Sequence, residues 1–313
     1  MRQARIKVDG EGYYHVTSRC ALQEYLMEAK AKDVFVRMMR RAATFSGVEI
    51  ITYCVMDNHF HILLKVPERR EVDMAELRGR ITVLYGKEKA GRIFARWKVF
   101  EEQGDMETVA DEQDAFRKRM YDLSEFGKTL KQRYSVWYRA NHTRKVGNDG
   151  HQEERAIEGT IWQGRFHSVL VEPTEKALTA VAAYIDMNPV RAKLVSDAAA
   201  YRWSGYGAAG RGDPDAKAAR KIVDARIYAS ILDEKTHGFA KQVPSVSRGV
   251  AVGTELFVSA TIDVAKGKER RRKGVVAMPL AKEGSLALLC SAGRRMAEAS
   301  VGNSYLQNSD EVA

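Results

Sequence analysis

Residues 53–66 show the clearest alternation of apolar and polar positions in the chain. The pattern predicts two short strands that are joined at Asp57-Asn58, with the second strand starting at His59. Successive side chains of a strand point to opposite faces of the sheet. One face of the second strand would carry His59, His61, Leu63 and Lys65, and the other would carry Phe60, Ile62, Leu64 and Val66. The apolar set can therefore enter a core while both imidazoles point into a cleft.

The residues before this hairpin predict a strand and a helix. Aromatic and β-branched residues over Gly12–Arg19 favour a strand. Apolar residues at helical spacing indicate an amphipathic helix over residues 30–46, which Gly47 would end. Strand, helix and hairpin in this order predict an α+β sandwich, in which helices cover an antiparallel sheet.

The middle of the chain has a helical pattern over residues 71–141, with polar breaks near Gly91 and Gly104. The last of these helices would run over residues 114–141. Residues 146–158 are polar and rich in glycine, which is typical of a loop. Residues 159–172 then predict another strand.

A further helix is expected to open at Pro173-Thr174 and to end at Asn188, because Pro189 follows. Its apolar stripe comprises Leu178, Val181, Ala182 and Ile185. Tyr184 and Asn188 are one turn apart at the edge of this stripe. An edge position lets both side chains reach a cleft while the helix stays packed on the sheet.

Composition narrows the functional classes. The 313 residues are 45% hydrophobic, which is enough for a core, and no apolar run is long enough for a bilayer span. The N-terminus lacks a secretory apolar region, and the three cysteines are far apart, so we expect a reduced, cytoplasmic protein without membrane association. The net charge of +10 favours a polyanionic partner such as nucleic acid.

The basic residues are concentrated in two segments. Residues 128–145 carry six basic residues and no acidic one, and residues 266–273 carry six with only Glu269. Aromatic residues between the cations of the first segment could stack on bases, but their helical spacing favours a position in the core. The second segment fits either a DNA clamp or a solvated tail. The predicted DNA-binding residues are Lys128, Lys131, Arg133, Arg139, Arg165, Arg191, Arg270, Arg271 and Arg272, and Arg165 fits a structural ion pair equally well.

The chemistry of these positions predicts a metal site and a nucleophile. Imidazoles two residues apart on a strand can share a divalent cation, although an ordinary pair of surface histidines explains His59 and His61 as well. The amide oxygen of Asn188 is a suitable third ligand for Mg²⁺ or Mn²⁺. Tyr184 would lie beside the cation, which would polarise a scissile phosphate for attack by the phenol.

Three motifs together resemble the REP-associated tyrosine transposases, relatives of the IS200/IS605 single-tyrosine transposases in the HUH nuclease superfamily. They are Val55-Met-Asp-Asn-His-Phe-His-Ile-Leu63, Trp162-Gln-Gly-Arg-Phe166 and Tyr184-Ile-Asp-Met-Asn-Pro-Val-Arg-Ala-Lys-Leu-Val195. The resemblance implies a ferredoxin-like core, with His59 and His61 as metal ligands and Tyr184 as the nucleophile. Asn188 stands where the insertion-sequence branch has a longer glutamine.

The resemblance also implies a reaction and a substrate. The expected activity is transesterification of single-stranded or hairpin DNA through a 5′-phosphotyrosine intermediate, without a nucleotide cofactor. A catalytically inactive hairpin-binding regulator of the same fold is the alternative, and a phosphoesterase that activates water ranks below both. We expect a catalytic domain over residues 1–210, with a helical insertion at 71–141, and a basic accessory region over 211–313. Whether the protein is a monomer or a dimer, and which subunit supplies the tyrosine, stays open.

Overall fold

The protein folds around one central β-sheet in the computed structural model, which describes residues 6–21, 26–146, 153–225, 228, 251–254, 256–258, 261, 275–279 and 287–291. Its first four strands are β1 (Gly12–Arg19), β2 (Glu49–Val55), β3 (His59–Val66) and β6 (His167–Val171). They lie in the order β2-β3-β1-β6, with every neighbouring pair antiparallel. The predicted antiparallel sheet is therefore confirmed.

Short strands from the C-terminal third extend this sheet. β7 (Ala251–Gly253) pairs in parallel with β6, and β9 (Ala287–Ser291) and β8 (Val275–Pro279) follow in antiparallel order. Residues beyond 210 thus continue the sheet that carries the predicted catalytic residues.

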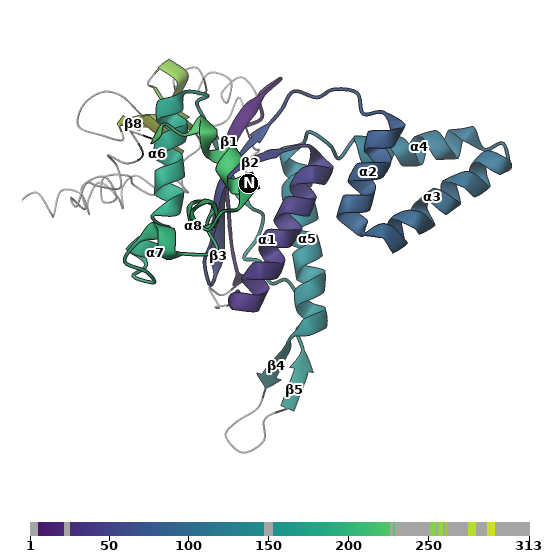
Figure 1. The fold of residues 1–313 in the computed structure, drawn as a ribbon, viewed down its shortest axis with the longest axis horizontal. Coiled ribbons are helices and arrows are strands. Elements are labelled where there is room, and N and C mark those ends of the chain that lie inside the picture. Colours follow the sequence, from purple (N-terminus) through teal and green to yellow (C-terminus); the bar gives the residue numbers. More distant parts are fainter. Residues whose placement is uncertain are drawn as a thin grey trace, which may run out of the picture.

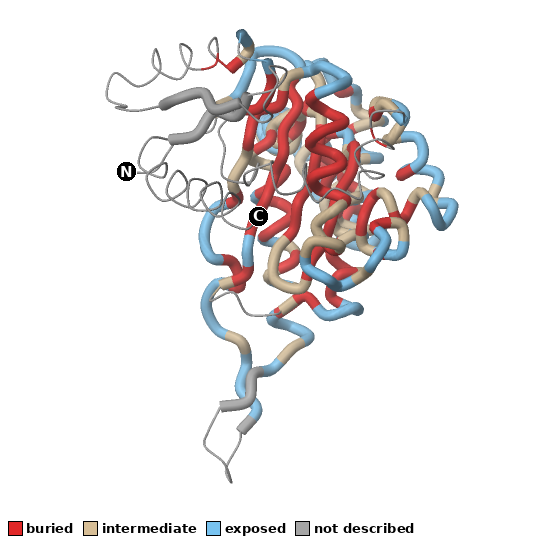
Figure 2. Tube along the Cα trace, turned by 90° about the vertical axis from the view of Figure 1, so that its left-hand side faces the viewer, coloured by how far each residue is buried: buried red, intermediate tan, exposed pale blue. Residues whose placement is uncertain are grey.

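Two helices cover one face of the sheet (Figure 1), α1 (Ala29–Ser46) and α5 (Leu123–Asn141). Their apolar sides enclose one hydrophobic core together with the alternate β3 residues Phe60, Ile62, Leu64 and Val66. Figure 2 shows the buried segments gathered in the sheet and the helices beside it. Strand order and helix placement give the βαββαβ arrangement of a ferredoxin-like fold, with α5 as its second helix. α1 ends where predicted, at Gly47, whose φ of 68° is left-handed.

α6 (Glu175–Asp186) covers the opposite face of the sheet (Figure 1). The Thr174 side chain caps its first turn by accepting a hydrogen bond from Ala177 N–H. The predicted stripe of Leu178, Val181, Ala182 and Ile185 packs into a second core with Leu63 of β3. The helix ends at Asp186, two residues earlier than expected, and a short helix, α7 (Asn188–Arg191), starts there with Pro189 in its first turn.

The helical insertion is composed of α2 (Met74–Tyr85), α3 (Lys87–Glu102) and α4 (Met106–Arg117), and Figure 1 shows it reaching away from the sheet. A third hydrophobic core, which includes Leu77 and Trp97, holds it together. The predicted break near Gly91 is wrong, because Gly91 lies inside α3 and the break falls at Gly86, where φ is 83°. The chain also breaks between α4 and α5, so the helix expected over 114–141 is two helices.

Two other expectations differ from the structure. The segment predicted as a loop contains a small hairpin of β4 (Thr143–Val146) and β5 (Glu153–Ala156) beyond the end of α5 (Figure 1). The strand expected over 159–172 is shorter, because only His167–Val171 is extended in the sheet. None of the helices in the described parts of the chain is long and apolar enough to cross a membrane.

Candidate active site

The two predicted histidines lie at the start of β3, on the sheet face that α6 covers. His61 is buried and His59 is half-buried, and their ring centres are 5.1 Å apart with nearly perpendicular planes. Nδ1 of His59 is 2.6 Å from Oδ1 of Asn58. Because an amide oxygen only accepts, His59 carries its proton on Nδ1, which leaves Nε2 as a lone-pair donor.

A third histidine lies directly behind His61. His15 of β1 is fully buried, and its Nε2 is 2.9 Å from Nδ1 of His61. The ring planes are 18° apart and the ring centres are 5.1 Å apart, so the two rings lie side by side, nearly in one plane, along this hydrogen bond. Nδ1 of His15 is buried and has no hydrogen-bond partner among the described residues. His15 is not among the site residues that the sequence predicts.

Tyr184 of α6 faces this histidine group. Its ring centre lies 6.0 Å from that of His61 and 5.9 Å from that of His15, with the rings edge to face in both cases. Packing of the α6 stripe against the sheet produces this placement, because Tyr184 lies one residue before Ile185 on the same buried side. The predicted nucleophile and the predicted metal ligands therefore meet within one chain.

Arg191 of α7 lies on the other side of the tyrosine. Its guanidinium carbon is 4.2 Å from the Tyr184 ring centre, and its Nη2 donates to the Tyr184 backbone carbonyl at 2.8 Å. Predicted as a DNA-binding residue, Arg191 contacts the predicted nucleophile in this structure.

Burial determines the charge of the histidines. Together with smaller effects of the nearby His167 and Arg191, it lowers the pKa of His15 to about 3. Burial, followed by the cation of Arg19, lowers the pKa of His59 to about 4. The pKa of His61 is also well below its ordinary value, because the ring is buried and lies close to His15 and His59. All three rings are therefore neutral at pH 7, which is the form that binds a metal.

The side chains of His59, His61 and Asn188 fit a divalent cation if further oxygen ligands complete its coordination. Nε2 of His59 and of His61 could bind a metal, and the side-chain amide of Asn188 lies at the end of α6. That amide donates to the carbonyls of Tyr184 and Ile185 at 3.0 and 3.1 Å, so its oxygen is the atom left for a ligand. No three His, Cys, Asp or Glu side chains in the described part of the chain are grouped to hold an ion. Phosphate and water oxygens would have to supply the other ligands.

A buried carboxylate fixes the helix that carries Tyr184. Asp186 is completely buried and accepts hydrogen bonds from Thr52 of β2 at 2.9 Å and from Tyr228 at 2.8 Å. Arg220 completes the group with an ion pair of 2.7 Å. Residues beyond 210 thus help to hold the end of α6 against β2.

The rim next to His59 carries two exposed cations. Arg19 at the end of β1 is the register partner of His59 on β3. The Trp162 motif lies alongside, since Cys20 and Trp162 form an isolated β-bridge and Gln163 N–H donates to the Arg19 carbonyl at 3.0 Å. This arrangement places the segment with the exposed Arg165 beside Arg19. Arg165 makes no ion pair with the described residues, so the structural role considered for it finds no support there.

Four of the other predicted DNA-binding residues lie on α5, across the sheet from Tyr184. Lys131 is buried, and its Nζ donates to the Gly164 carbonyl. Lys128 pairs with Glu125 at 3.2 Å, Arg133 lies 5.4 Å from the Tyr85 ring centre, and Arg139 donates to the Gly159 carbonyl at 3.1 Å. Arg270, Arg271 and Arg272 lie outside the described residues. The aromatic residues of α5 face the core, with Tyr134 and Tyr138 buried, as favoured from their spacing.

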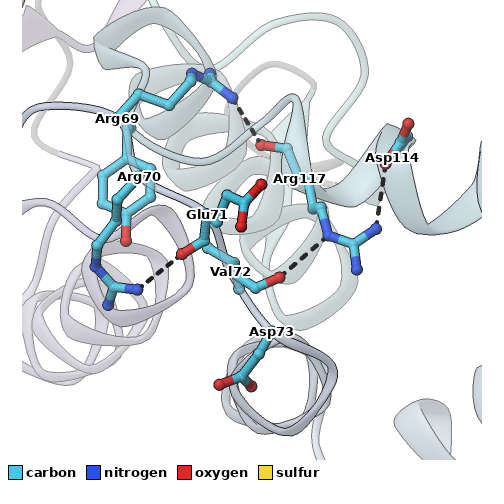
Figure 3. Close-up of a pocket in the computed structure, with 8 residues that line it drawn as sticks. Arg69, Arg70, Glu71, Val72, Asp73, Asp114 and Arg117 are labelled. Carbon is cyan, nitrogen blue, oxygen red and sulfur yellow. Dashed lines mark hydrogen bonds and ion pairs between the residues drawn. The ribbon is translucent and has the colours of Figure 1, made fainter.

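A separate pocket of about 710 Å³ lies where the insertion joins the core (Figure 3). Its arginines are already bonded within the protein: Arg69 donates to the Arg117 carbonyl, and Arg117 pairs with Asp114 and donates to the Val72 carbonyl. These contacts join β3, α2 and α4. The residues that line the pocket therefore hold the helical insertion against the core.

Comparisons with known proteins agree with the motifs. Residues 10–98, which include His15, His59 and His61, match the family described as transposase IS200-like. This part of the chain therefore carries the IS200-like transposase signature, and Tyr184 lies outside the match. A solved REP-associated tyrosine transposase bound to a REP hairpin is similar at 14% identity and a TM-score of 0.37, over 66% of this chain and 84% of that one. No curated protein matches the chain.

Proposed function

We propose that this protein is a metal-dependent endonuclease and strand transferase for single-stranded hairpin DNA, with Tyr184 as its nucleophile. The observation that carries the proposal is the position of Tyr184, whose ring faces His61 from the neighbouring helix of the same chain. The IS200-like match of residues 10–98 supports the reaction class. The hairpin substrate rests on the motif resemblance.

The proposed step is an exchange of phosphodiester bonds. The phenolic oxygen of Tyr184 attacks the scissile phosphorus, and a P–O(Tyr) bond forms as the P–O3′ bond breaks. The phenolic proton is lost, and the leaving 3′ oxygen takes up a proton to become a 3′-OH. The DNA segment downstream stays attached to the enzyme as a 5′-phosphotyrosine. A later attack by a 3′-OH reverses the step and rejoins strands without a nucleotide cofactor.

His59, His61 and Asn188 are the residues that would hold a divalent cation, Mg²⁺ or Mn²⁺. When bound, the cation would draw charge from the phosphate oxygens. Arg191 supplies a fixed positive charge against the Tyr184 ring, where negative charge develops as the proton leaves. The network at Asp186 holds α6 against the sheet, so Tyr184 attacks from a fixed position.

The exposed cations near His59 provide a path for the DNA backbone. Arg19 and Arg165 are close in the fold and next to the metal ligands, so they can contact phosphates on either side of the scissile bond. Arg139, whose guanidinium reaches the Gly159 carbonyl, would extend this path along the end of α5.

Formation of a covalent adduct tests the proposal. The full chain is incubated with labelled single-stranded hairpin oligonucleotides and Mn²⁺, and the product is separated under denaturing conditions. We expect a DNA-linked protein band that Tyr184→Phe lacks. Tyr13→Phe is the matched control, because Tyr13 is equally buried on the same sheet face and, among the described residues, its hydroxyl donates to Glu11 alone, so its adduct should form normally.

Other outcomes separate the alternatives. Hairpin binding without any adduct would support a catalytically inactive regulator. Cleavage without an adduct, unchanged in Tyr184→Phe, would indicate a phosphoesterase that uses water. Loss of cleavage in His59→Ala and His61→Ala is expected, and wild-type cleavage by both variants would refute the metal site.

A further inference from the structure

The inference concerns the buried pair His15 and His61, and it rests on the proposed role of His61 as a metal ligand. Their hydrogen bond joins Nε2 of His15 to Nδ1 of His61 at 2.9 Å. A histidine must be neutral to bind a metal, and a neutral pair has two ring protons, of which only one lies between the two nitrogen atoms. Two proton arrangements are compatible with this geometry.

In the first arrangement, His61 donates from Nδ1 to Nε2 of His15. Nε2 of His61 then has a free lone pair, and the proton of His15 is on Nδ1. In the second arrangement, Nε2 of His15 donates to Nδ1 of His61, and the proton of His61 is on Nε2. A protonated nitrogen has no lone pair for a metal, so His61 can bind a cation through Nε2 only in the first arrangement.

We propose that His15 is a positioning residue for the metal site. Its Nε2 accepts a hydrogen bond from Nδ1–H of His61, which keeps the Nε2 lone pair of His61 available to the cation. Three observations support this role. His15 is fully buried, so water cannot replace it as the acceptor. Its ring is nearly coplanar with that of His61, with 18° between the planes, so the two nitrogen atoms face each other along the hydrogen bond. Its edge-to-face contact with Tyr184 places the same ring against the nucleophile.

The arrangement explains an otherwise unfavourable feature of the core. Nδ1 of His15 is buried and unpaired within the described structure, and a buried polar group without a partner is destabilising. An apolar side chain at this position would avoid that penalty. It would also leave the Nδ1–H of His61 without an acceptor once a metal binds. Mutation of a residue that orients a metal ligand typically weakens metal binding by about 10- to 100-fold.

Two variants distinguish the acceptor role from simple packing. His15→Phe keeps an aromatic ring but cannot accept a hydrogen bond. His15→Gln offers an amide oxygen that can reach the position of the lost Nε2. We expect His15→Phe to bind Mn²⁺ about 10- to 100-fold more weakly, and His15→Gln to stay within a few-fold of the parent. Mn²⁺ binding is measured on the full chain by electron paramagnetic resonance, without DNA, and thermal unfolding confirms that each variant is folded.

His142→Phe is the matched control. It also removes a histidine that contacts a tyrosine ring, but His142 lies at the end of α5, on the opposite side of the sheet, with its ring stacked 3.9 Å from that of Tyr138. Its Mn²⁺ affinity should equal that of the parent. Equal affinity of folded His15→Phe and parent would overturn the proposal for His15 while leaving the metal site intact. A parent protein that binds no Mn²⁺ would instead refute both the metal site and the role of His15.

Nitrogen NMR of the unaltered protein gives a second readout that needs no variant. The chain has seven histidines, so ¹⁵N labelling of this residue type gives a spectrum that can be assigned. In the Mg²⁺-loaded protein, His61 should carry its proton on Nδ1, and His15 should also carry its proton on Nδ1. A proton on Nε2 of His61 under these conditions would contradict the proposal.

Discussion

The guanidinium carbon of Arg191 lies 4.2 Å from the centre of the Tyr184 ring, and the same side chain donates to the Tyr184 carbonyl at 2.8 Å. The guanidinium of Arg191 is thus fixed against the proposed nucleophile by a second contact, to the backbone. Burial lowers the pKa of Arg191, with Tyr184 opposing that effect, so the guanidinium is held in a partly desolvated position. A cation in such a position stabilises negative charge more strongly than one in water.

We therefore expect Arg191→Gln to slow adduct formation at saturating hairpin DNA by about 5- to 30-fold, since a partly desolvated cation on an aromatic ring contributes about 1–2 kcal/mol. Arg191→Lys should recover part of the rate. Hairpin affinity should change little, as measured by fluorescence anisotropy. A large loss of affinity with an unchanged rate at saturation would instead make Arg191 a phosphate contact, as the sequence predicted.

Arg19 should contribute to DNA binding. It is exposed beside His59, and an arginine that neutralises one phosphate of a single strand changes the slope of log affinity against log salt by about 0.7. Arg19→Gln should weaken hairpin binding and reduce the slope by that amount, as measured by anisotropy at several salt concentrations. Arg92→Gln is the control, because Arg92 is an exposed cation on α3 that pairs with Glu88. Equal slopes for the two variants would exclude Arg19 as a phosphate contact.

Local patterns predicted much of this architecture because each depends on neighbouring residues. Alternation alone placed His59–Val66, and the helix stripe at Leu178 identified the buried side of α6. The break at Gly86 could not be distinguished from the continuous helix at Gly91, because both glycines are open to solvent and a glycine fits either conformation.

His15 and Arg19 were missed for a different reason. The alternation over Gly12–Arg19 already assigns His15, Thr17 and Arg19 to one face of a strand. What it does not give is the neighbour of that strand and the register of the pair. Only the pairing of β1 with β3 brings His15 to His61 and Arg19 to His59. The site is thus formed by contacts between distant segments, which periodicity does not encode.

Asp186 is expected to have a large effect on stability. Its carboxylate is fully buried and holds Arg220, Tyr228 and Thr52 together. Asp186→Asn would leave Arg220 without its counter-charge, and breaking a buried ion pair from one side lowers the free energy of unfolding by about 3–5 kcal/mol. Urea denaturation measures the change, with Asp111→Asn on the exposed side of α4 as the control.

A double variant tests whether the ion pair is the cause. If the unpaired Arg220 cation is responsible, the double variant Asp186→Asn, Arg220→Gln should lose less free energy of unfolding than the sum of the losses in the two single variants. Strict additivity would mean that the two residues act independently. Slower adduct formation is also expected in Asp186→Asn, because the same network orients the helix of Tyr184.

The pH dependence of stability follows from the buried histidines. The folded-state pKa of His15 is lowered to about 3 and that of His59 to about 4, whereas an unfolded histidine titrates near 6.5. Between about pH 6.5 and 4 the histidines bind protons in the unfolded chain but stay neutral in the folded chain. Their contribution to the free energy of unfolding is therefore complete above about pH 6.5 and is lost as the pH falls towards 4. Each histidine contributes up to about 1.4 kcal/mol per pH unit in this range. The nearby cations Arg19 and Arg191 and the imidazole of His167 reinforce this direction.

Urea unfolding at pH 7.5, 6.5 and 5.5 should show this loss, at values where most carboxylates remain ionised. His15→Gln lacks one of the titrating rings, so its stability should fall less steeply with decreasing pH than that of the parent. Mn²⁺ should make the fall steeper, since it binds only the neutral imidazoles and dissociates as they are protonated. A parent whose stability is constant between pH 7.5 and 5.5 would show that the histidines are already solvated or charged in the folded protein.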